Sequence, residues 1–254
     1  MNIDKKTRLF IILGGFFIAN ALVAEFIGSK LFSLENSLGL KPIDITLFGI
    51  EHLSFNLTCG VLLWPMVFVM TDIINEYYGK QGVKLLSYLA AGLIAYTFVM
   101  VYLAMKTHPF DLWENSGQSV QIGSMQVAYN KVFGQGLWII IGSLVAFLIG
   151  QMLDVWVFHW IKLKSGEKYL WLRSTGSTLI SQLIDSFVVL IIAFYIGNNW
   201  PLKLVLAVGI VNYIYKFTVA MALTPVLYIL HNRIDKYLGI EQAQQMTEAA
   251  AQED

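Results

Sequence analysis

The chain has 254 residues, of which 57% are hydrophobic and only 13% are charged, and its mean hydropathy is +0.63. Soluble domains carry about 25% charged residues, so this composition excludes an ordinary soluble domain and favours a protein embedded in a bilayer. The 17 basic and 17 acidic residues cancel, which excludes the basic surface of a nucleic-acid-binding protein. The single cysteine, Cys59, excludes an internal disulfide and a multi-cysteine metal site.

Long apolar stretches predict about six transmembrane helices, because a spanning helix needs roughly 20 mostly apolar residues. In chain order these stretches are Leu9–Ile27, Asn56–Ile74, Leu85–Ala104, Leu137–Ile161, Thr178–Ile196 and Leu202–Leu230. Helices satisfy their own backbone hydrogen bonds in lipid. The expected fold is therefore all-α, with a single six-helix transmembrane domain over residues 1–238.

Connecting and terminal segments complete the expected organisation. The first apolar run is long enough to span the membrane, so no cleavable signal peptide is expected. The longest loop, Lys106–Gly136, contains a helical segment that ends at Phe133 and forms either a surface cap or a re-entrant piece. Residues 239–254 are polar, and we expect them to be disordered or a frayed helix.

Basic residues predict the orientation, because they are enriched in cytoplasmic loops. If the chain crosses the membrane six times, eleven Lys and Arg residues share the side of both termini and five lie on the other side. The eleven are Lys5, Lys6, Arg8, Lys80, Lys84, Lys162, Lys164, Lys168, Arg173, Arg233 and Lys236. We therefore expect both termini in the cytoplasm.

A polar stripe runs along the fifth apolar stretch at three- and four-residue spacing. It consists of Ser174, Ser177, Thr178, Ser181, Gln182 and Asp185. Such a stripe faces a partner helix or a wet cavity rather than lipid. The serines fit helix packing as well as function, whereas an acid beside a glutamine at membrane depth favours a binding site.

Other polar side chains also fall at membrane depth. Gln151 and Asp154 are three residues apart and share a helix face, Asp72 lies near the end of the second stretch, and Asn20 lies within the first. We expect all of them to converge on one central cavity with the polar stripe. Glu76 fits either an interfacial acid near Lys80 or a functional residue.

Lys216 lies too deep in the sixth stretch to be a topology charge, and it requires a carboxylate partner. The candidates are Asp72, Asp154 and Asp185. Asp185 is expected to bind the ligand, and one of the other two to pair with Lys216. Because three deep acids share one lysine, a cationic or donor-rich ligand is favoured. His159 is expected to be an interfacial residue rather than a proton relay.

Several segments resemble the bacterial queuosine-precursor transporters, a family of vitamin-uptake-transporter-like integral membrane proteins. The segments are Thr71-Asp72 with Tyr78-Gly79, Gly150–Phe158, Leu170–Thr178, Ser181–Ser186, Ile192–Phe194, and Asn212-Tyr213 with Lys216. The resemblance covers about Asn20 to Lys216. It does not extend to Asn75 and Glu76, where family members differ.

The resemblance implies six helices and import of 7-cyano-7-deazaguanine or 7-aminomethyl-7-deazaguanine, precursors of the tRNA base queuosine, across the bacterial inner membrane. A deazaguanine presents a donor edge that a carboxylate accepts and a flat face for aromatic stacking. The expected substrate-binding residues are Asn20, Asp72, Gln151, Asp154, Ser177, Thr178, Gln182, Asp185 and Lys216. No cofactor, metal or nucleic acid is expected, and a homodimer or an energising partner is possible.

Three other functions compete with a secondary transporter. The chain's small size also fits a substrate-binding subunit of an ATP-driven vitamin importer. Co-purification with an energising partner would distinguish that subunit from a secondary transporter. An intramembrane enzyme is disfavoured, because the sequence has no phosphate-binding glycine loop, no His-Glu-x-x-His and no Gly-x-Ser-x-Gly. A scaffold is disfavoured because it has no use for costly charges at membrane depth.

Overall fold

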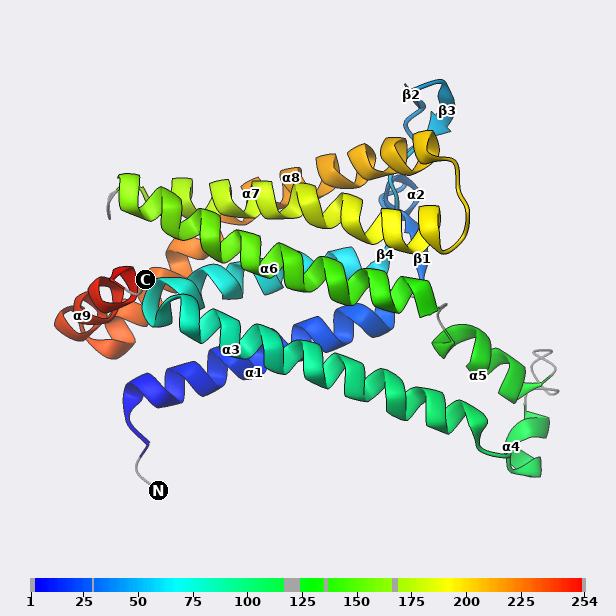
Figure 1. Ribbon diagram of the computed structural model, residues 1–254, viewed down its shortest axis with the longest axis horizontal. Coiled ribbons are helices and arrows are strands. Elements are labelled where there is room, and N and C mark those ends of the chain that lie inside the picture. The colour runs from blue at the N-terminus through cyan, green and yellow to red at the C-terminus, as the bar shows by residue number, and fades with distance from the viewer. Residues whose placement is uncertain (1–2, 29, 117–123, 135–136, 166–168, 253–254) are drawn as a thin grey trace.

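The computed structural model describes residues 3–28, 30–116, 124–134, 137–165 and 169–252. In this part of the chain five helices are long and apolar enough to cross a membrane, and they form one elongated bundle (Figure 1). The long helices are α1 (Lys5–Ile27), α3 (Trp64–Lys106), α6 (Leu137–Ser165), α7 (Leu170–Leu190), which continues as the π-helix η4 (Ile191–Ile196), and α8 (Leu202–Leu238). The chain is thus a multi-pass membrane protein.

Helix α3 reverses direction at Gly79, whose backbone angles are φ 66° and ψ −172°. Figure 1 shows its two arms, residues 64–78 and 80–106, running in opposite directions. Glycine adopts a positive φ without the penalty that a side chain imposes. The second and third apolar stretches therefore fall largely within one element, and its first arm is shorter than the roughly 20 residues that a spanning helix needs.

The second stretch is helical only in part. It begins as strand β4 (Asn56–Thr58), continues as the 3₁₀ helix η1 (Cys59–Leu62), and becomes α-helix from Trp64, with Pro65 in the first turn. Proline suits this position because the first helical amides have no acceptor within the helix. The predicted start at Asn56 is wrong for a helix, since hydropathy measures apolar length and not backbone conformation.

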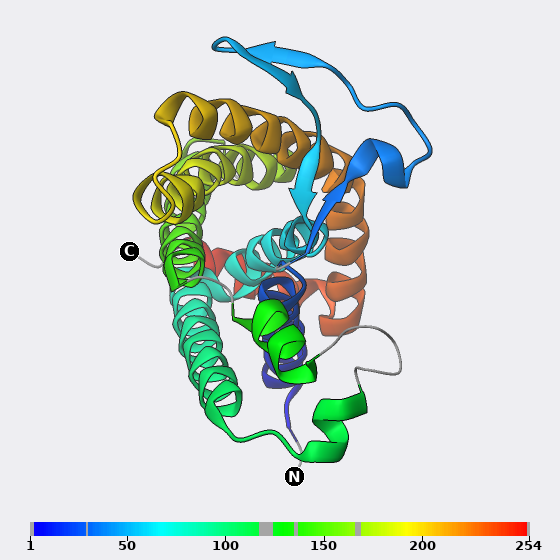
Figure 2. The ribbon, with the colours of Figure 1, turned by 90° about the vertical axis from the view of Figure 1, so that its right-hand side faces the viewer.

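The segment between α1 and α3 contains strands, which the all-α prediction omits. Strands β1 (Leu31–Ser33) and β4 pair antiparallel, as do β2 (Ile45–Leu47) and β3 (Ile50–Leu53), with the short helix α2 (Leu34–Ser37) between the pairs (Figure 2). The buried carboxylate of Glu35 accepts hydrogen bonds from the amides of Phe55 at 2.9 Å and Ile43 at 3.4 Å. These bonds join distant parts of the segment.

The Lys106–Gly136 loop contains α4 (Asp111–Ser116) and α5 (Met125–Phe133), and α5 confirms the predicted helical segment. Part of the loop, residues 117–123 and 135–136, lies outside the described residues. Both helices lie beyond the long helices at the end of the molecule remote from the termini (Figure 1).

Both termini lie at the same end of the molecule (Figure 1). Lys5 Nζ donates to the carbonyl of Tyr237 at 3.0 Å, and the Tyr78 hydroxyl donates to the carbonyl of Lys6 at 2.7 Å. The sequence predicts a disordered or frayed tail, whereas residues Ile240–Ala251 form helix α9. Its Ala243, Met246 and Ala250 are buried, because even a polar helix docks when small and apolar residues recur on one face.

Candidate functional site

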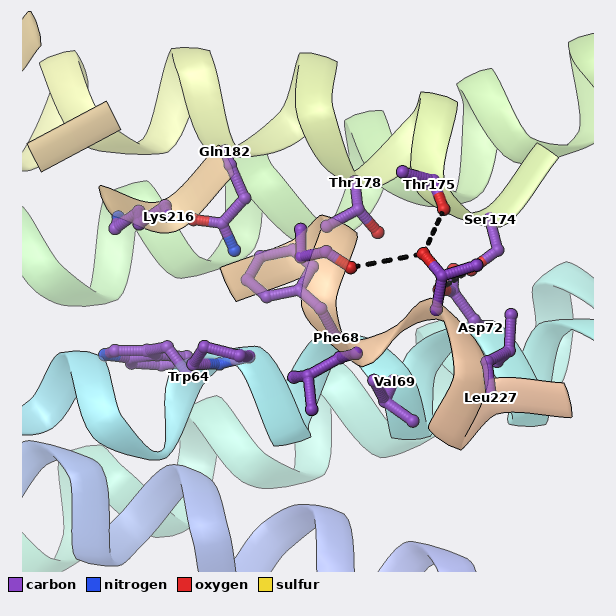
Figure 3. A pocket seen from close by; sticks show the side chains of 14 residues that line it. Trp64, Phe68, Val69, Asp72, Ser174, Thr175, Thr178, Gln182, Lys216 and Leu227 are labelled. Carbon is purple, nitrogen blue, oxygen red and sulfur yellow. Dashed lines mark hydrogen bonds between the residues drawn. The ribbon is translucent and has the colours of Figure 1, made fainter. Parts of the chain in front are cut away.

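A central cavity lies between α3, α7 and α8 (Figure 3). Its polar lining residues are Asp72, Ser174, Thr175, Thr178, Gln182, Lys216 and Thr224, and its apolar lining residues are Trp64, Pro65, Phe68, Val69, Ala220, Leu223 and Leu227. A largely apolar pocket with a few convergent polar groups is the usual form of a small-molecule site.

Each wall of the cavity is a row of residues at four-residue spacing, which places them on one helix face. Helix α3 contributes Trp64–Phe68–Asp72, α7 contributes Ser174–Thr178–Gln182, and α8 contributes Lys216–Ala220–Thr224. Figure 3 shows Gln182 and Lys216 near one end, on the side opposite Trp64, and Asp72 with Ser174 at the other end. The cavity therefore has a polar group at each end and aromatic side chains on one wall.

Asp72 is the carboxylate of the central cavity. Its side chain is buried, and its Oδ2 accepts a hydrogen bond from the hydroxyl of Ser174. Its Oδ1 has no hydrogen-bond partner among the residues that the structure describes. A buried acceptor without a partner is costly and normally binds water or a ligand, so Asp72 presents one acceptor to an occupant of the cavity.

Gln182 presents the second acceptor. Its side chain is buried, and its Oε1 likewise has no partner within the described chain. Because Asp72 and Gln182 lie toward opposite ends of the cavity (Figure 3), an occupant can meet both acceptors at once. The free volume of the cavity is about 30 Å³, which is room for about one water molecule, so the cavity is closed in this state. It must widen to admit a flat solute, and the two acceptors then favour donor groups along the edges of that solute.

Lys216 pairs with Asp185 and not with Asp72 or Asp154. Lys216 Nζ lies 2.5 Å from Asp185 Oδ2, and the lysine is buried while the aspartate side chain remains 19% exposed. The predicted partner of Lys216, Asp72 or Asp154, is therefore wrong, whereas ligand binding by Asp185 stays a prediction. The reason is tertiary: α8 places Lys216 beside the C-terminal half of α7.

Three predicted site residues lie behind the cavity wall. Thr71 donates to Gln151 Oε1 at 2.8 Å, Ser181 donates to Asp154 Oδ1 at 3.1 Å, and Ser177 donates to the carbonyl of Ser174 at 3.0 Å. None of the three is among the cavity-lining residues. The bonds of Gln151 and Asp154 join α6 to α3 and α7, whereas the bond of Ser177 lies within α7. Of the residues expected to converge, Asp72, Thr178, Gln182 and Lys216 line the cavity.

Asn20 lies apart from the site. Its side-chain amide donates to the carbonyl of Phe16, one turn earlier on α1, at 2.8 Å. It is not among the cavity-lining residues. A polar side chain within an apolar helix can satisfy itself on its own backbone, so membrane depth alone does not identify a binding residue.

The aromatic wall is absent from the predicted site. Trp64 and Phe68 precede Asp72 by eight and four residues, and that spacing was available in the sequence. Trp64 also packs on Phe147 of α6, with ring centroids 5.5 Å apart.

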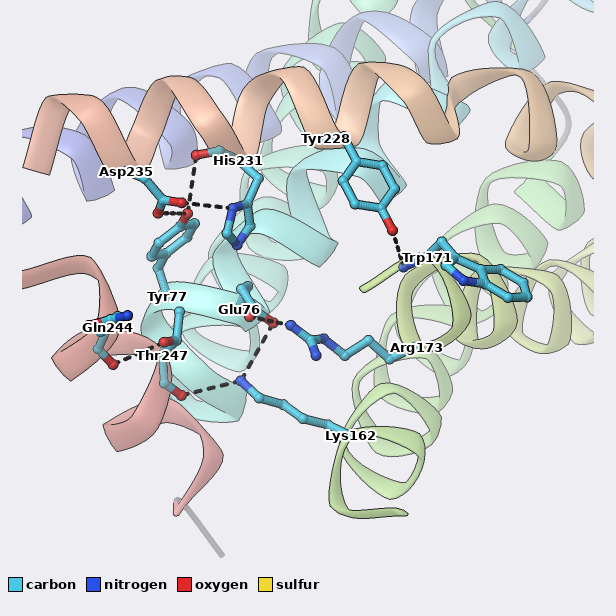
Figure 4. Close-up of polar contacts among 10 residues, drawn as sticks. All are labelled: Glu76, Tyr77, Lys162, Trp171, Arg173, Tyr228, His231, Asp235, Gln244 and Thr247. Carbon is cyan, nitrogen blue, oxygen red and sulfur yellow. Dashed lines mark hydrogen bonds and ion pairs between the residues drawn. The ribbon is translucent and has the colours of Figure 1, made fainter. Parts of the chain in front are cut away.

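A second polar cluster also differs from its sequence interpretation. Glu76 is buried, with Arg173 Nη2 2.5 Å from its Oε1 and Lys162 Nζ 3.5 Å from its Oε2 (Figure 4). Arg173 and Lys162 are also buried. They are therefore not solvated loop charges, although both were counted among the eleven basic residues that predict the orientation.

His159 is also buried, and its Nε2 lies 3.0 Å from Asn75 Oδ1. Its depth in the membrane stays a prediction. Among the residues that the structure describes, no group of three or more His, Cys, Asp or Glu side chains is arranged to hold a metal ion.

Comparison with known proteins identifies the family. The family described as "Putative vitamin uptake transporter" matches residues 58–230. A Bacillus subtilis (strain 168) protein named "Probable queuosine precursor transporter" is 31% identical over 181 residues, covering 70% of this chain and 73% of the relative. The "Queuosine precursor transporter" of Escherichia coli (strain K12) is 24% identical over 200 residues, covering 75% of this chain and 80% of the relative.

No solved structure matches the chain. The family match covers more than half of the chain and includes every residue that lines the central cavity. These matches also exclude an enzyme, because the family and its named relatives are transporters. The chain belongs to the vitamin uptake transporter family, alongside relatives named queuosine precursor transporter.

Proposed function

We propose that this protein imports 7-deazaguanine precursors of queuosine, 7-cyano-7-deazaguanine and/or 7-aminomethyl-7-deazaguanine, across the bacterial inner membrane. The observation that carries the proposal is the unpartnered Oδ1 of buried Asp72 in a cavity with an aromatic wall. A guanine-like edge offers a ring N–H and an exocyclic amine. The free Oδ1 accepts one of these donors, and Oδ2 accepts the other through the lone pair that the Ser174 hydroxyl does not occupy. The names of the relatives support the same substrate class.

In this proposal Asp72 takes the recognition role that the sequence assigned to Asp185. Trp64 and Phe68 provide faces against which a planar base can stack, an interaction that contributes about 0.5–1.5 kcal/mol beyond the buried area. Gln182, at the other end of the cavity, accepts from a further donor such as the aminomethyl group of the cationic precursor. Lys216 and Asp185 neutralise each other at this end of the cavity, so the carboxylate that selects the ligand is Asp72.

We further propose six membrane crossings, with the two arms of α3 each counting as one and both termini in the cytoplasm. Both termini lie at the same end of the molecule, which supports an even number of crossings. Reporter fusions at the C-terminus test the orientation, and a periplasmic C-terminus would contradict it.

The decisive experiment measures uptake of labelled precursor by cells that cannot synthesise it. We expect Asp72→Asn to lower uptake at micromolar precursor by at least about tenfold, since losing the charged partner of a buried hydrogen bond costs about 2–5 kcal/mol. Asp111→Asn makes the same chemical change at an exposed carboxylate of α4 and should leave uptake unchanged. Equal uptake by Asp72→Asn and the parent, at equal membrane expression, would refute the assignment.

Reconstitution of the purified chain in liposomes separates the two transport hypotheses. Uptake by the chain alone supports a self-sufficient transporter. Uptake that appears only when an ATP-hydrolysing partner is added would instead make the chain the substrate-binding subunit of a larger importer.

A further inference from the structure

A second cavity lies at the end of the bundle that holds both termini. We call it the inner vestibule; α3, α7 and α8 line it with Glu76, Arg173 and Tyr228, and α9 lines it with Gln244 and Thr247. Figure 4 shows these side chains beside His231 and Asp235 of α8. About half of the vestibule surface is polar, whereas the surface of the central cavity is mainly apolar.

The two cavities follow one another along the same three helices. On α3, Asp72 lines the central cavity and Glu76, one helical turn further, lines the vestibule. The neighbouring residues Ser174 and Arg173 of α7 divide in the same way, as do Leu227 and Tyr228 of α8. Figure 3 places Asp72, Ser174 and Leu227 together at one end of the central cavity. The described lining residues of the two cavities do not overlap. The linings of the two cavities are therefore contiguous along α3, α7 and α8, and the residues where they meet form the boundary between the cavities.

The boundary consists of a buried ion pair and an apolar side chain. Glu76 is 1% exposed, Arg173 and Leu227 are each 2% exposed, and Arg173 Nη2 lies 2.5 Å from Glu76 Oε1. Lys162 approaches the other oxygen of Glu76 at 3.5 Å and also donates to the carbonyl of Thr247 in α9 at 3.2 Å. Glu76 thus remains next to a cation even when Arg173 moves away.

Stability alone does not explain this arrangement. Replacing a buried ion pair with packed apolar residues is often neutral or stabilising, because desolvation offsets the attraction between the charges. An ion pair differs from an apolar contact when the helices separate: water solvates the freed charges, so an open state is accessible. A charged boundary therefore suits a barrier that must open and close.

We propose that the Glu76–Arg173 pair, with Leu227, is the inner gate of the transport path. Solute leaves the central cavity for the inner vestibule when Arg173 parts from Glu76, and Lys162 keeps the carboxylate neutralised in the open state. This inference rests on the central cavity being the solute site. It makes Glu76, Arg173 and Lys162 gating residues, while recognition stays with Asp72.

Cysteine accessibility tests the gate without any solute. In a Cys59→Ser background, which removes the single native cysteine, Ala220→Cys places a thiol in the central cavity and Gln244→Cys places one in the vestibule. Each is labelled in right-side-out and inside-out vesicles with a charged, membrane-impermeant methanethiosulfonate. We expect the vestibule thiol to react rapidly from one side and the cavity thiol to react slowly from that same side.

Adding Glu76→Gln should accelerate labelling of the cavity thiol from the vestibule side by about tenfold or more and leave the vestibule thiol unchanged. Asp235→Asn is the matched control, because Asp235 lines the vestibule and accepts from Tyr77 but is not part of the boundary. An unchanged rate with Glu76→Gln, or an equal acceleration with Asp235→Asn, would overturn the gate.

Leu227→Ala opens the boundary without altering a charge and provides a second test if Glu76→Gln does not fold. It should also accelerate labelling of the cavity thiol, and failure to do so in folded protein counts against the gate. Added 7-cyano-7-deazaguanine should slow labelling of the Ala220→Cys thiol. Loss of that protection alone contradicts the proposed substrate and leaves the gate intact.

Discussion

Lys216 of α8 and Asp185 of α7 form an ion pair at 2.5 Å beside the central cavity. The pair joins two of the three helices that line the cavity, and Lys216 itself belongs to the lining. The lysine is buried, and the aspartate is 19% exposed on its side chain. The contact therefore links α7 to α8 beside the cavity.

Breaking this pair should reduce stability more than removing it entirely. Asp185→Asn leaves the buried ammonium of Lys216 without its carboxylate, which we expect to cost about 1–3 kcal/mol, less than for a fully buried pair because Asp185 is partly solvated. The double variant Asp185→Asn with Lys216→Met should recover part of that loss. Thermal unfolding in detergent of both single variants and the double variant measures the coupling. Additive losses would show that the two side chains do not interact.

The segment between α1 and α3 should loosen in acid. Burial raises the pKa of Glu35, but the hydrogen bonds from the amides of Phe55 and Ile43 and the hydroxyl of Ser33 outweigh it and hold the pKa below its ordinary value of 4.5. A carboxylate with a depressed pKa stabilises the fold fully above the unfolded-state pKa. That contribution is lost as the pH falls below 4.5 and through the lower, folded-state pKa.

Amide hydrogen exchange over residues 31–58, corrected for the intrinsic rate, measures this loosening. Glu35→Gln should give faster exchange already at neutral pH, because a neutral amide is a weaker acceptor than a carboxylate. Glu51→Gln, at an exposed position in β3, is the control and should exchange like the parent. Protection that is identical in Glu35→Gln and the parent would show that the segment does not depend on this carboxylate.

Gly79 should be intolerant of a side chain. Its φ of 66° with ψ of −172° lies in a region that essentially only glycine adopts, so Gly79→Ala should cost about 1–3 kcal/mol. Gly92→Ala, in the second arm of α3 with open space around it, should be neutral or stabilising by up to about 1 kcal/mol. Unfolding temperatures of the two variants in the same detergent provide the comparison, and equal values would mean that the reversal tolerates a β-carbon.

Local composition and periodicity determined the membrane class and much of the helical structure. A run of apolar residues needs no partner to show that it belongs in lipid, because the cost of exposing it to water is additive along the chain. Spacing of three and four residues places Ser174, Thr178 and Gln182 on one face of α7 whatever lies opposite. These two properties predicted the membrane class, most of the long helices and the polar wall of the cavity.

Only the tertiary structure decided which groups meet. Lys216 has three candidate carboxylates in the sequence, and the packing of α8 on α7 selects Asp185. Arg173 and Lys162 look like topology charges because their partner, Glu76, lies about 90 positions earlier on α3. Asp72 receives its hydrogen bond from Ser174, on a different helix. Such pairings depend on the three-dimensional approach of distant segments, whereas hydropathy and spacing report only what neighbouring residues share.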